Sequence, residues 1–296
     1  MSTTCTSAIT HPGNTCDSNN IGAITKLALV KRGTTIATSI ANLATYSTWT
    51  TLIQDEDCIP LPDIIDINIE DEEDVKQTTN YGIDLKIRAG KRKATYMMNV
   101  PLCVHKKLRT LSDNKWDIVK FDSNGHVYAT EVASDDYRGF TAEVDIEKMM
   151  TNDGTGQAAN TPIQITEVYP GQFDDNGVEV DISWSATDLN PLIEVVMTES
   201  GTSSASAATV TVYEQCGGNS SGVKQYAVTG LVTGDFQFVT AAGATISQTG
   251  ITDNGDGSYD FTFDADLETC TCSLVDPSSM TTNGYKTGTA ATITVA

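Results

Sequence analysis

Two runs of alternating residues decide the fold, YGIDLKIR at 81–88 and ATYMMNV at 94–100, and the segment AGKRK at 89–93 joins them. In each run apolar side chains recur at every second position, the period of a β-strand with one buried face. A glycine within a short basic segment fits a turn between two such strands. The pattern therefore predicts a β-hairpin whose tip is formed by residues 89–93.

Alternation and turn signals continue on both sides of this hairpin. Residues 116–121 and 126–132 flank a turn at 122–125, and apolar residues alternate again over 140–146. The run 102–111 differs, because its apolar residues recur near helical spacing after a proline. Thr, Ser, Gly, Asp and Asn are abundant, which favours strands and turns over helices. We therefore expect an all-β protein whose N-terminal domain is a β-sandwich or barrel with one short helix.

The length of 296 residues allows two domains, each with its own core. Residues 1–20 are polar and show no period, which predicts a flexible N-terminal arm. The small and polar segment TESGTSSASA at 198–207 predicts a linker. It would separate a β domain at 21–197 from a second domain at 208–296, where about seven short strands at close turn spacing indicate a β-sandwich.

The net charge of −21, from 39 acidic and 18 basic residues, is unevenly distributed. Ten of the 18 basic residues lie within 86–120. Isoleucines alternate with polar residues before this region, which predicts a strand with an acidic face, and the acidic run 70–74 predicts a solvated loop. An acidic surface argues against nucleic-acid binding through phosphate neutralisation, but it would let DNA slide past without adhering. The alternative is that the charge serves only to keep the protein soluble.

The basic hairpin tip and the acidic loop are candidates for a contact between subunits, because opposite charges could meet across a subunit boundary. The alternative is a solvated hairpin tip whose basic side chains guard a strand edge. The candidate contact residues are Lys91, Arg92, Lys93, Asp71, Glu72 and Glu73.

No arrangement of residues indicates catalysis, and we expect no catalytic residue, cofactor or metal site. The histidines at 11, 105 and 126 stand in unrelated contexts and are interpreted as surface residues. The segment 253–258 fits a turn between strands better than a calcium loop, because it lacks alternating ligands and a downstream glutamate. Carboxylates are so plentiful that choosing two of them as acid and base carries no information.

The seven cysteines show no zinc spacing, and an odd number in a reducing compartment predicts free thiols. A bridge from Cys216 to Cys270 or Cys272 is the alternative. The start of the chain has neither the basic nor the apolar region of a secretory signal, and no stretch approaches the roughly 18 apolar residues of a membrane span. We therefore expect a protein made in the cytoplasm, without a membrane partner.

Two resemblances follow from these patterns. The segments VTGLVTGDF at 228–236 and NGDGSYDFTF at 254–263 resemble those of bacterial immunoglobulin-like domains. That resemblance implies a two-sheet sandwich used for display or adhesion. The order of arm, acidic loop, hairpin, short helix and further strands resembles that of tail tube proteins of long-tailed bacteriophages, some of which carry such a domain at the C-terminus. It implies β-sandwich protomers that join into hexameric rings, which stack around an acidic lumen.

The expected function is accordingly that of a virion structural protein, a tail tube subunit that would be assembled in the host cytoplasm. Its partners would be copies of itself, other tail or virion proteins, and DNA that passes during ejection without specific binding. Candidate lumen residues are Asp63, Asp66 and Glu70. The alternative is another virion surface component, such as a head fibre, decoration or adhesin-like protein, that binds a host surface or glycan through the immunoglobulin-like domain. A hydrolase in the acidic N-terminal domain is a third reading that no group of residues supports.

Overall fold

The computed structural model describes residues 22–112, 114–150, 159–216, 226–264, 267–275 and 284–295. The chain divides into two compact units, unit 1 at Met1–Asn190 and unit 2 at Pro191–Ala296. Strands make up 51% of the structure and helices 14%, which confirms an all-β fold. The N-terminal segment 1–20, expected to be a flexible arm, lies outside the described residues. None of the helices in the described part is long and apolar enough to cross a membrane.

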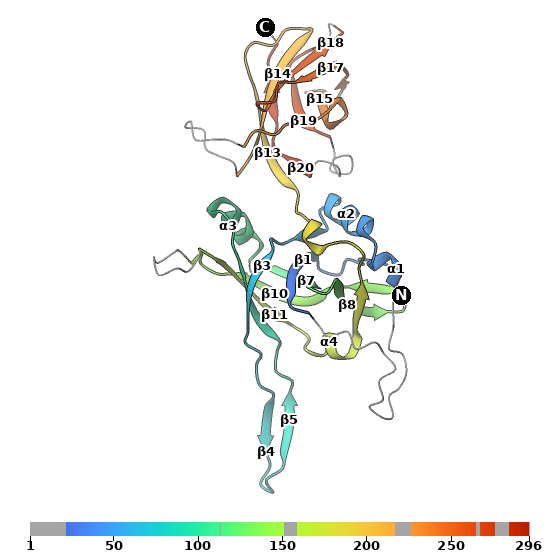
Figure 1. Ribbon diagram of the computed structural model, residues 1–296, viewed down its shortest axis with the longest axis vertical. Helices are drawn as coiled ribbons and strands as arrows, with labels where there is room; N and C mark the ends of the chain where they lie inside the picture. The colour runs from blue at the N-terminus through green and yellow to red at the C-terminus, as the bar shows by residue number, and fades with distance from the viewer. Residues whose placement is uncertain are drawn as a thin grey trace. The chain divides into compact units, whose positions relative to one another are not determined.

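Unit 1 contains twelve described strands, four α-helices and two short 3-10 helices (Figure 1). The strands are β1 (Ile24–Lys31), β2 (Cys58–Pro60), β3 (Ile64–Ile69), β4 (Val75–Thr78), β5 (Asp84–Arg88), β6 (Lys93–Met98), β7 (Asn114–Asp122), β8 (His126–Ala133), β9 (Asp136–Arg138), β10 (Phe140–Ile146), β11 (Thr161–Glu167) and β12 (Gly177–Asp181). The helices are α1 (Ile40–Leu43), α2 (Tyr46–Gln54), α3 (Leu102–Leu108), η1 (Arg109–Leu111), α4 (Gly171–Asn176) and η2 (Ala186–Asp188).

The large sheet of unit 1 curls into a barrel. Its strands follow the order β12-β8-β7-β10-β11-β6-β3, and β1 lies beside β7 and β2 beside β1. After β2, the Leu61 backbone N–H donates to the Leu27 carbonyl (2.8 Å), and the chain then enters β3. Lys26 of β1 forms an ion pair with Asp63, next to β3 (2.8 Å). The segment β2–β3 thus contacts β1 at its start and β6 at its end, which closes this part of the sheet on itself, while β12 lies at an edge beside β8.

Alternate residues of the barrel strands fill its interior. Since successive side chains of a strand point to opposite faces, every second residue of each strand faces inward. The apolar core so formed includes Leu27, Leu29, Leu61, Tyr96, Met98, Ile118, Phe140, Ala142, Val144, Ile163 and Ile165. These buried residues come from β1, β6, β7, β10, β11 and the segment after β2, so the barrel has a packed core and not a pore.

Helices cover parts of the barrel that the sequence left unassigned. The α3–η1 segment agrees with the predicted helix at 102–111, but the expectation of one short helix is wrong. Helix α2 is rich in Ser and Thr, whose intrinsic helix propensity is low. It forms because Trp49 is fully buried against Phe121 of β7, with ring centroids 5.2 Å apart, and donates its indole N–H to the Leu43 carbonyl (2.9 Å). Tertiary packing therefore decides this helix.

Unit 2 is a two-sheet sandwich. Its strands are β13 (Ile193–Glu199), β14 (Ala207–Glu214), β15 (Phe236–Thr240), β16 (Thr245–Ile246), β17 (Gln248–Asp253), β18 (Ser258–Phe263), β19 (Cys270–Leu274), β20 (Tyr285–Thr289) and β21 (Ala291–Ile293), with the 3-10 helix η3 (Thr233–Asp235) before β15. One sheet has the order β17-β18-β14-β13-β20 and the other β16-β15-β19-β21. With β13 taken as strand A, the first sheet reads D-E-B-A with β20 paired in parallel beside A, and the second reads C′-C-F-G, an order similar to that of immunoglobulin sandwiches.

The boundary between the units falls between Asn190 and Pro191, and not in a linker at 198–207. Strand β13 covers 193–199 and pairs with β14, so the predicted linker is mostly the turn of a hairpin inside unit 2. Val195 and Met197 of β13 are buried in the core of unit 2. The small and polar residues that suggested a linker are those that a tight connection between two strands also requires.

Cysteine pairing also differs from the expectation. Cys58, Cys270 and Cys272 are free and buried, whereas Cys103 and Cys216 are disulfide-bonded. The alternative of a bridge from Cys216 to Cys270 or Cys272 is wrong, because both of these β19 residues point into the core of unit 2 as thiols.

Candidate assembly surface

A long β-hairpin, here called the arm, extends from the barrel (Figure 1). It consists of residues 64–98: β3 and β4 lead outward, and β5 and β6 return. The tip is the turn 79–83, where the Thr79 N–H bonds to the Ile83 carbonyl and Gly82 has a φ of 76°. A positive φ is readily adopted by glycine only. The predicted hairpin tip at 89–93 is therefore wrong, because this segment joins β5 to β6 in the same returning strand path.

The predicted acidic loop lies alongside the predicted basic tip in the middle of the arm. The Glu70 N–H donates to the Lys93 carbonyl (2.8 Å) and the Glu72 N–H to the Lys91 carbonyl (2.9 Å). Asp71 accepts a hydrogen bond from the Lys93 N–H (2.9 Å). Residues 70–74 are exposed and belong to no strand, as a solvated loop requires, but these hydrogen bonds hold the run against the returning side of the arm between β3–β6 and β4–β5.

Charged side chains are paired across the arm as well. Lys86 contacts Asp74 (2.8 Å), Arg88 contacts Glu72 (3.6 Å) and Lys93 contacts Glu70 (3.5 Å). The hydrogen bonds that Asp74 accepts, first from Lys86 and then from the Gly90 N–H, lower the pKa of its carboxyl group. Opposite charges that were expected to meet between subunits therefore meet first within one chain.

The six predicted contact residues lie in this middle part of the arm. The Arg92 side chain pairs outside the arm. It forms an ion pair with Asp174 of α4, and its guanidinium lies over the Phe173 ring, 4.7 Å from the centroid. Glu73 is exposed and Lys91 is half-buried. A contact of Lys91, Arg92, Lys93, Asp71, Glu72 and Glu73 with a neighbouring subunit stays a prediction.

The predicted lumen residues lie along one strand path: just before β3, within it and just after it. Asp63 is bound to Lys26, which is almost fully buried, although the Asp63 side chain itself is 57% exposed. Asp66 is exposed, and Glu70 accepts a hydrogen bond from Asn68 (2.8 Å) in addition to its ion pair with Lys93. The three carboxylates share one segment, and their position in a lumen stays a prediction.

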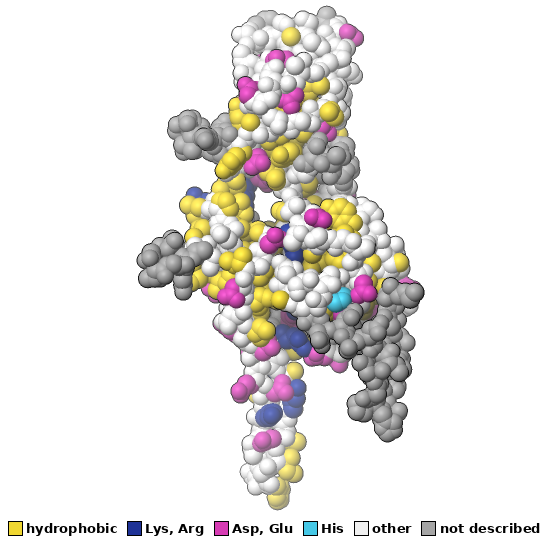
Figure 2. All heavy atoms as spheres, viewed as in Figure 1, with side chains coloured by type: hydrophobic (Ala, Val, Ile, Leu, Met, Phe, Trp, Pro, Cys, Tyr) yellow, Lys and Arg dark blue, Asp and Glu magenta, His cyan; other side chains and the backbone are white. Residues whose placement is uncertain are grey.

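The outer part of the arm exposes an apolar face, which the sequence analysis did not foresee. Ile83 just before β5 and Leu85 and Ile87 within it occupy alternate positions, the spacing of one face, with exposed fractions of 60%, 51% and 60%. Tyr81 at the tip is 92% exposed. Figure 2 shows hydrophobic side chains along one side of the arm near its tip. The alternation was read as the sign of a strand with a buried face, but in the isolated chain nothing buries it.

The opposite face of the same hairpin is charged. Lys76 of β4 lies directly across from Lys86, and Thr78 from Asp84, whose carboxylate accepts the Thr78 hydroxyl proton in a hydrogen bond (2.6 Å). Within the described structure β4 and β5 pair only with each other. A two-stranded hairpin without a core is marginally stable in water, and its open edges and apolar face favour contact with another protein surface.

The interpretation of the histidines as surface residues is wrong for two of them. His105 on α3 is buried, with its Nδ1 3.1 Å from the Thr161 hydroxyl, and His126 on β8 is buried among carboxylates. His11 lies outside the described residues.

In the described ranges no three His, Cys, Asp or Glu side chains are grouped so as to hold a metal ion. No protein-family model matches the chain, and no curated protein matches its sequence.

Proposed function

We propose that this protein is a self-assembling structural subunit, and specifically a tail tube subunit of a long-tailed bacteriophage that forms stacked, hexameric rings around an acidic DNA conduit. The observation that carries the proposal is the exposed apolar face of the arm, Ile83, Leu85 and Ile87. Burying apolar surface is favourable by about 25 cal/mol per Å², and an arm without a core of its own gains that energy only from a neighbour.

The rest of the molecule supports this proposal. Unit 1 is a packed barrel with a protruding hairpin, and unit 2 is a two-sheet sandwich with a separate core. The resemblance to tail tube proteins implies a β-sandwich protomer, and some members of that family carry a C-terminal immunoglobulin-like domain. The charge of −21 would suit a conduit, because an acidic wall repels the phosphates of passing DNA.

The test is electron microscopy of the purified full chain, wild type and with the substitutions Ile83→Thr, Leu85→Thr and Ile87→Thr combined. Threonine keeps the strand propensity but removes the apolar face. We expect rings or tubes from the wild type and loss of them in the triple variant, with unit 1 still folded. Lys76→Thr combined with Asp84→Thr, on the charged face of the same hairpin, is the matched control and should still assemble.

Two outcomes would overturn the proposal. One is a wild-type protein that stays monomeric at high concentration. The alternative function, binding of a host surface or glycan by unit 2, would then be tested on a glycan array. The other is a triple variant that assembles as well as the wild type, since the apolar face would then not be the assembly surface.

A further inference from the structure

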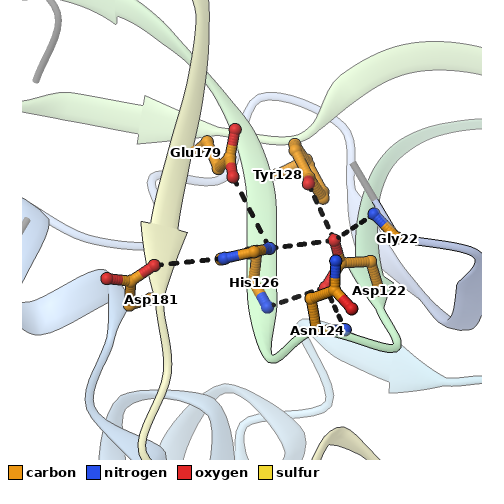
Figure 3. A network of polar contacts seen from close by, with 7 residues as sticks. All are labelled: Gly22, Asp122, Asn124, His126, Tyr128, Glu179 and Asp181. Carbon is orange, nitrogen blue, oxygen red and sulfur yellow. Dashed lines mark hydrogen bonds and ion pairs between the residues drawn. The ribbon is translucent and has the colours of Figure 1, made fainter. Parts of the chain in front are cut away.

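A buried polar cluster lies at the turn between β7 and β8, away from the arm (Figure 3). Its centre is Asp122, whose carboxylate is inaccessible to solvent. One carboxylate oxygen accepts the backbone N–H groups of Asn124 and His126 (both 2.9 Å). The other accepts the Gly22 N–H (2.8 Å), the Tyr128 hydroxyl (2.9 Å) and the His126 ring (2.9 Å). This carboxylate thereby joins the turn, the segment that leads into β1, and the His126 ring.

His126 connects this centre to β12. Its Nδ1 lies 2.9 Å from Asp122 Oδ2 and 3.5 Å from Glu179 Oε1, and its Nε2 lies 3.3 Å from Asp181 Oδ1. Figure 3 shows the imidazole between Asp122 on one side and Asp181 on the other. Both Glu179 and Asp181 belong to β12, which pairs with β8 alone among the described strands.

The geometry around the imidazole favours a proton on both ring nitrogens, because each nitrogen lies close to a carboxylate oxygen. A neutral imidazole has a single N–H. Its other nitrogen would then place a lone pair against the lone pairs of a carboxylate oxygen, which is a repulsive contact. An imidazolium ion donates from both nitrogens and places its positive charge among three carboxylates. Burial alone would lower the pKa of His126, but the hydrogen bond to Asp122 and the charges of Asp122, Glu179 and Asp181 outweigh it and raise the pKa.

We propose that His126 is a pH-sensitive latch, which as an imidazolium ion fastens β12 to the β7–β8 turn and lets β12 open when it loses its proton. The groups facing the ring are Asp122 from β7, Tyr128 from β8, and Glu179 and Asp181 from β12. Deprotonation removes the only cation among these groups and leaves three carboxylates close together. The opened β12 uncovers the edge of β8, and β12 is the last strand of unit 1 before the chain enters unit 2.

The direction of the pH effect follows from linkage. A group whose pKa is raised on folding contributes stability that is complete below its unfolded value, about 6.5 for histidine, and is lost as the pH rises through the folded value. The latch is therefore closed below pH 6.5 and opens as the pH rises through the raised pKa of His126. The equilibrium constant for opening of β12 should rise about tenfold for each unit by which the pKa of His126 exceeds 6.5.

Hydrogen–deuterium exchange of the full-length protein, read by mass spectrometry between pH 5 and 9.5, tests both parts of the latch. Exchange at the imidazole C2 position reports the titration midpoint of each histidine, and we expect His126 above 6.5 and buried His105 below it, since burial and then Arg109 lower the pKa of His105. Backbone exchange in residues 177–182, corrected for its intrinsic pH dependence, should lose protection across the His126 midpoint. Residues 140–146 of β10 should not.

Two variants sharpen the test. Asp181→Asn removes one carboxylate and should lower both the His126 midpoint and the pH at which β12 opens, whereas Asp145→Asn, an exposed residue of β10, should change neither. A His126 midpoint at or below 6.5 in the wild type overturns the proposal. So does protection of β12 that is independent of pH.

Discussion

At the scale of single residues, Asp122 shows how one side chain determines a local structure. It ends β7, begins the turn at 122–125 and accepts five hydrogen bonds while fully buried. Burial alone would raise the pKa of Asp122, but the hydrogen bonds donated by His126, Gly22 and Tyr128 lower it to about 2. A buried carboxylate is tolerated only when its lone pairs are satisfied in this way.

Asp122→Asn should lower the free energy of unfolding of unit 1 by about 3 kcal/mol at pH 7. The side-chain NH2 of the new asparagine would face hydrogen-bond donors, and His126 would lose the negative charge of its partner at position 122. The tryptophans at 49, 116 and 184 all lie in unit 1, so urea unfolding followed by tryptophan fluorescence reports this unit. Asp66→Asn, at an exposed aspartate, is the control and should change stability little.

The same variant should respond to acid differently from the wild type. A carboxylate whose pKa falls from 3.8 to about 2 on folding contributes stability that is present above pH 3.8 and lost as the pH falls toward 2, roughly 2 kcal/mol in total. The stability difference between wild type and Asp122→Asn should therefore shrink between pH 5 and pH 2.5. An unchanged difference would contradict this account of Asp122.

At the scale of elements, the arm shows how far local patterns lead. The alternation at 81–88 and 94–100 correctly indicated extended chain, since β5 and β6 lie in these runs. The alternation could not show that β5 and β6 run in the same direction along the arm. A basic segment with a glycine looks like a turn from its composition alone, and residues 89–93 were therefore predicted to be the tip. The turn is at 79–83, and Gly90 serves close packing instead: a Cβ at this position would lie 1.8 Å from the Glu72 carbonyl oxygen.

Gly90→Ala should separate the two sides of the arm, because a Cβ and a backbone oxygen cannot occupy the same space. Cleavage by trypsin at the basic residues 86–93 should become at least about tenfold faster, as local opening exposes the backbone to the protease. The overall free energy of unfolding should change little, since the outer arm has no buried core. Gly234→Ala, where a Cβ meets open space, is the control; equal cleavage rates in both variants would refute close packing at Gly90.

At the scale of the whole molecule, the chain consists of two units with separate cores. The core of the barrel draws on residues of unit 1 and the core of the sandwich on residues of unit 2. Unit 2 depends on β13, which lies between β14 and β20 and buries Val195 and Met197. A domain beginning at 208 would therefore lack a central strand.

Residues 191–296, expressed alone, should unfold cooperatively, and residues 208–296 should not. Losing Val195 and Met197 from the core costs about 4 kcal/mol in buried apolar surface, before the lost pairing of β13 with β14 and β20 is counted. Urea unfolding followed by circular dichroism compares the two fragments. Equal stability of both fragments would contradict the boundary at Asn190 and Pro191.

The sequence by itself determined the all-β class, the helix that follows Pro101, the turn at 122–125 and the β-sandwich of the C-terminal unit. Each depends on a period or a turn residue that local chemistry imposes on a short segment. Only the tertiary structure decided where the arm turns, that Ser- and Thr-rich residues form α2 against Phe121, and that His126 lies among three carboxylates. These features depend on which distant segments become neighbours. The local sequence pattern cannot predict the burial and charge that distant segments supply. The arm joins both: its alternation predicted strands, while its exposed apolar face became visible only when the pairing was known.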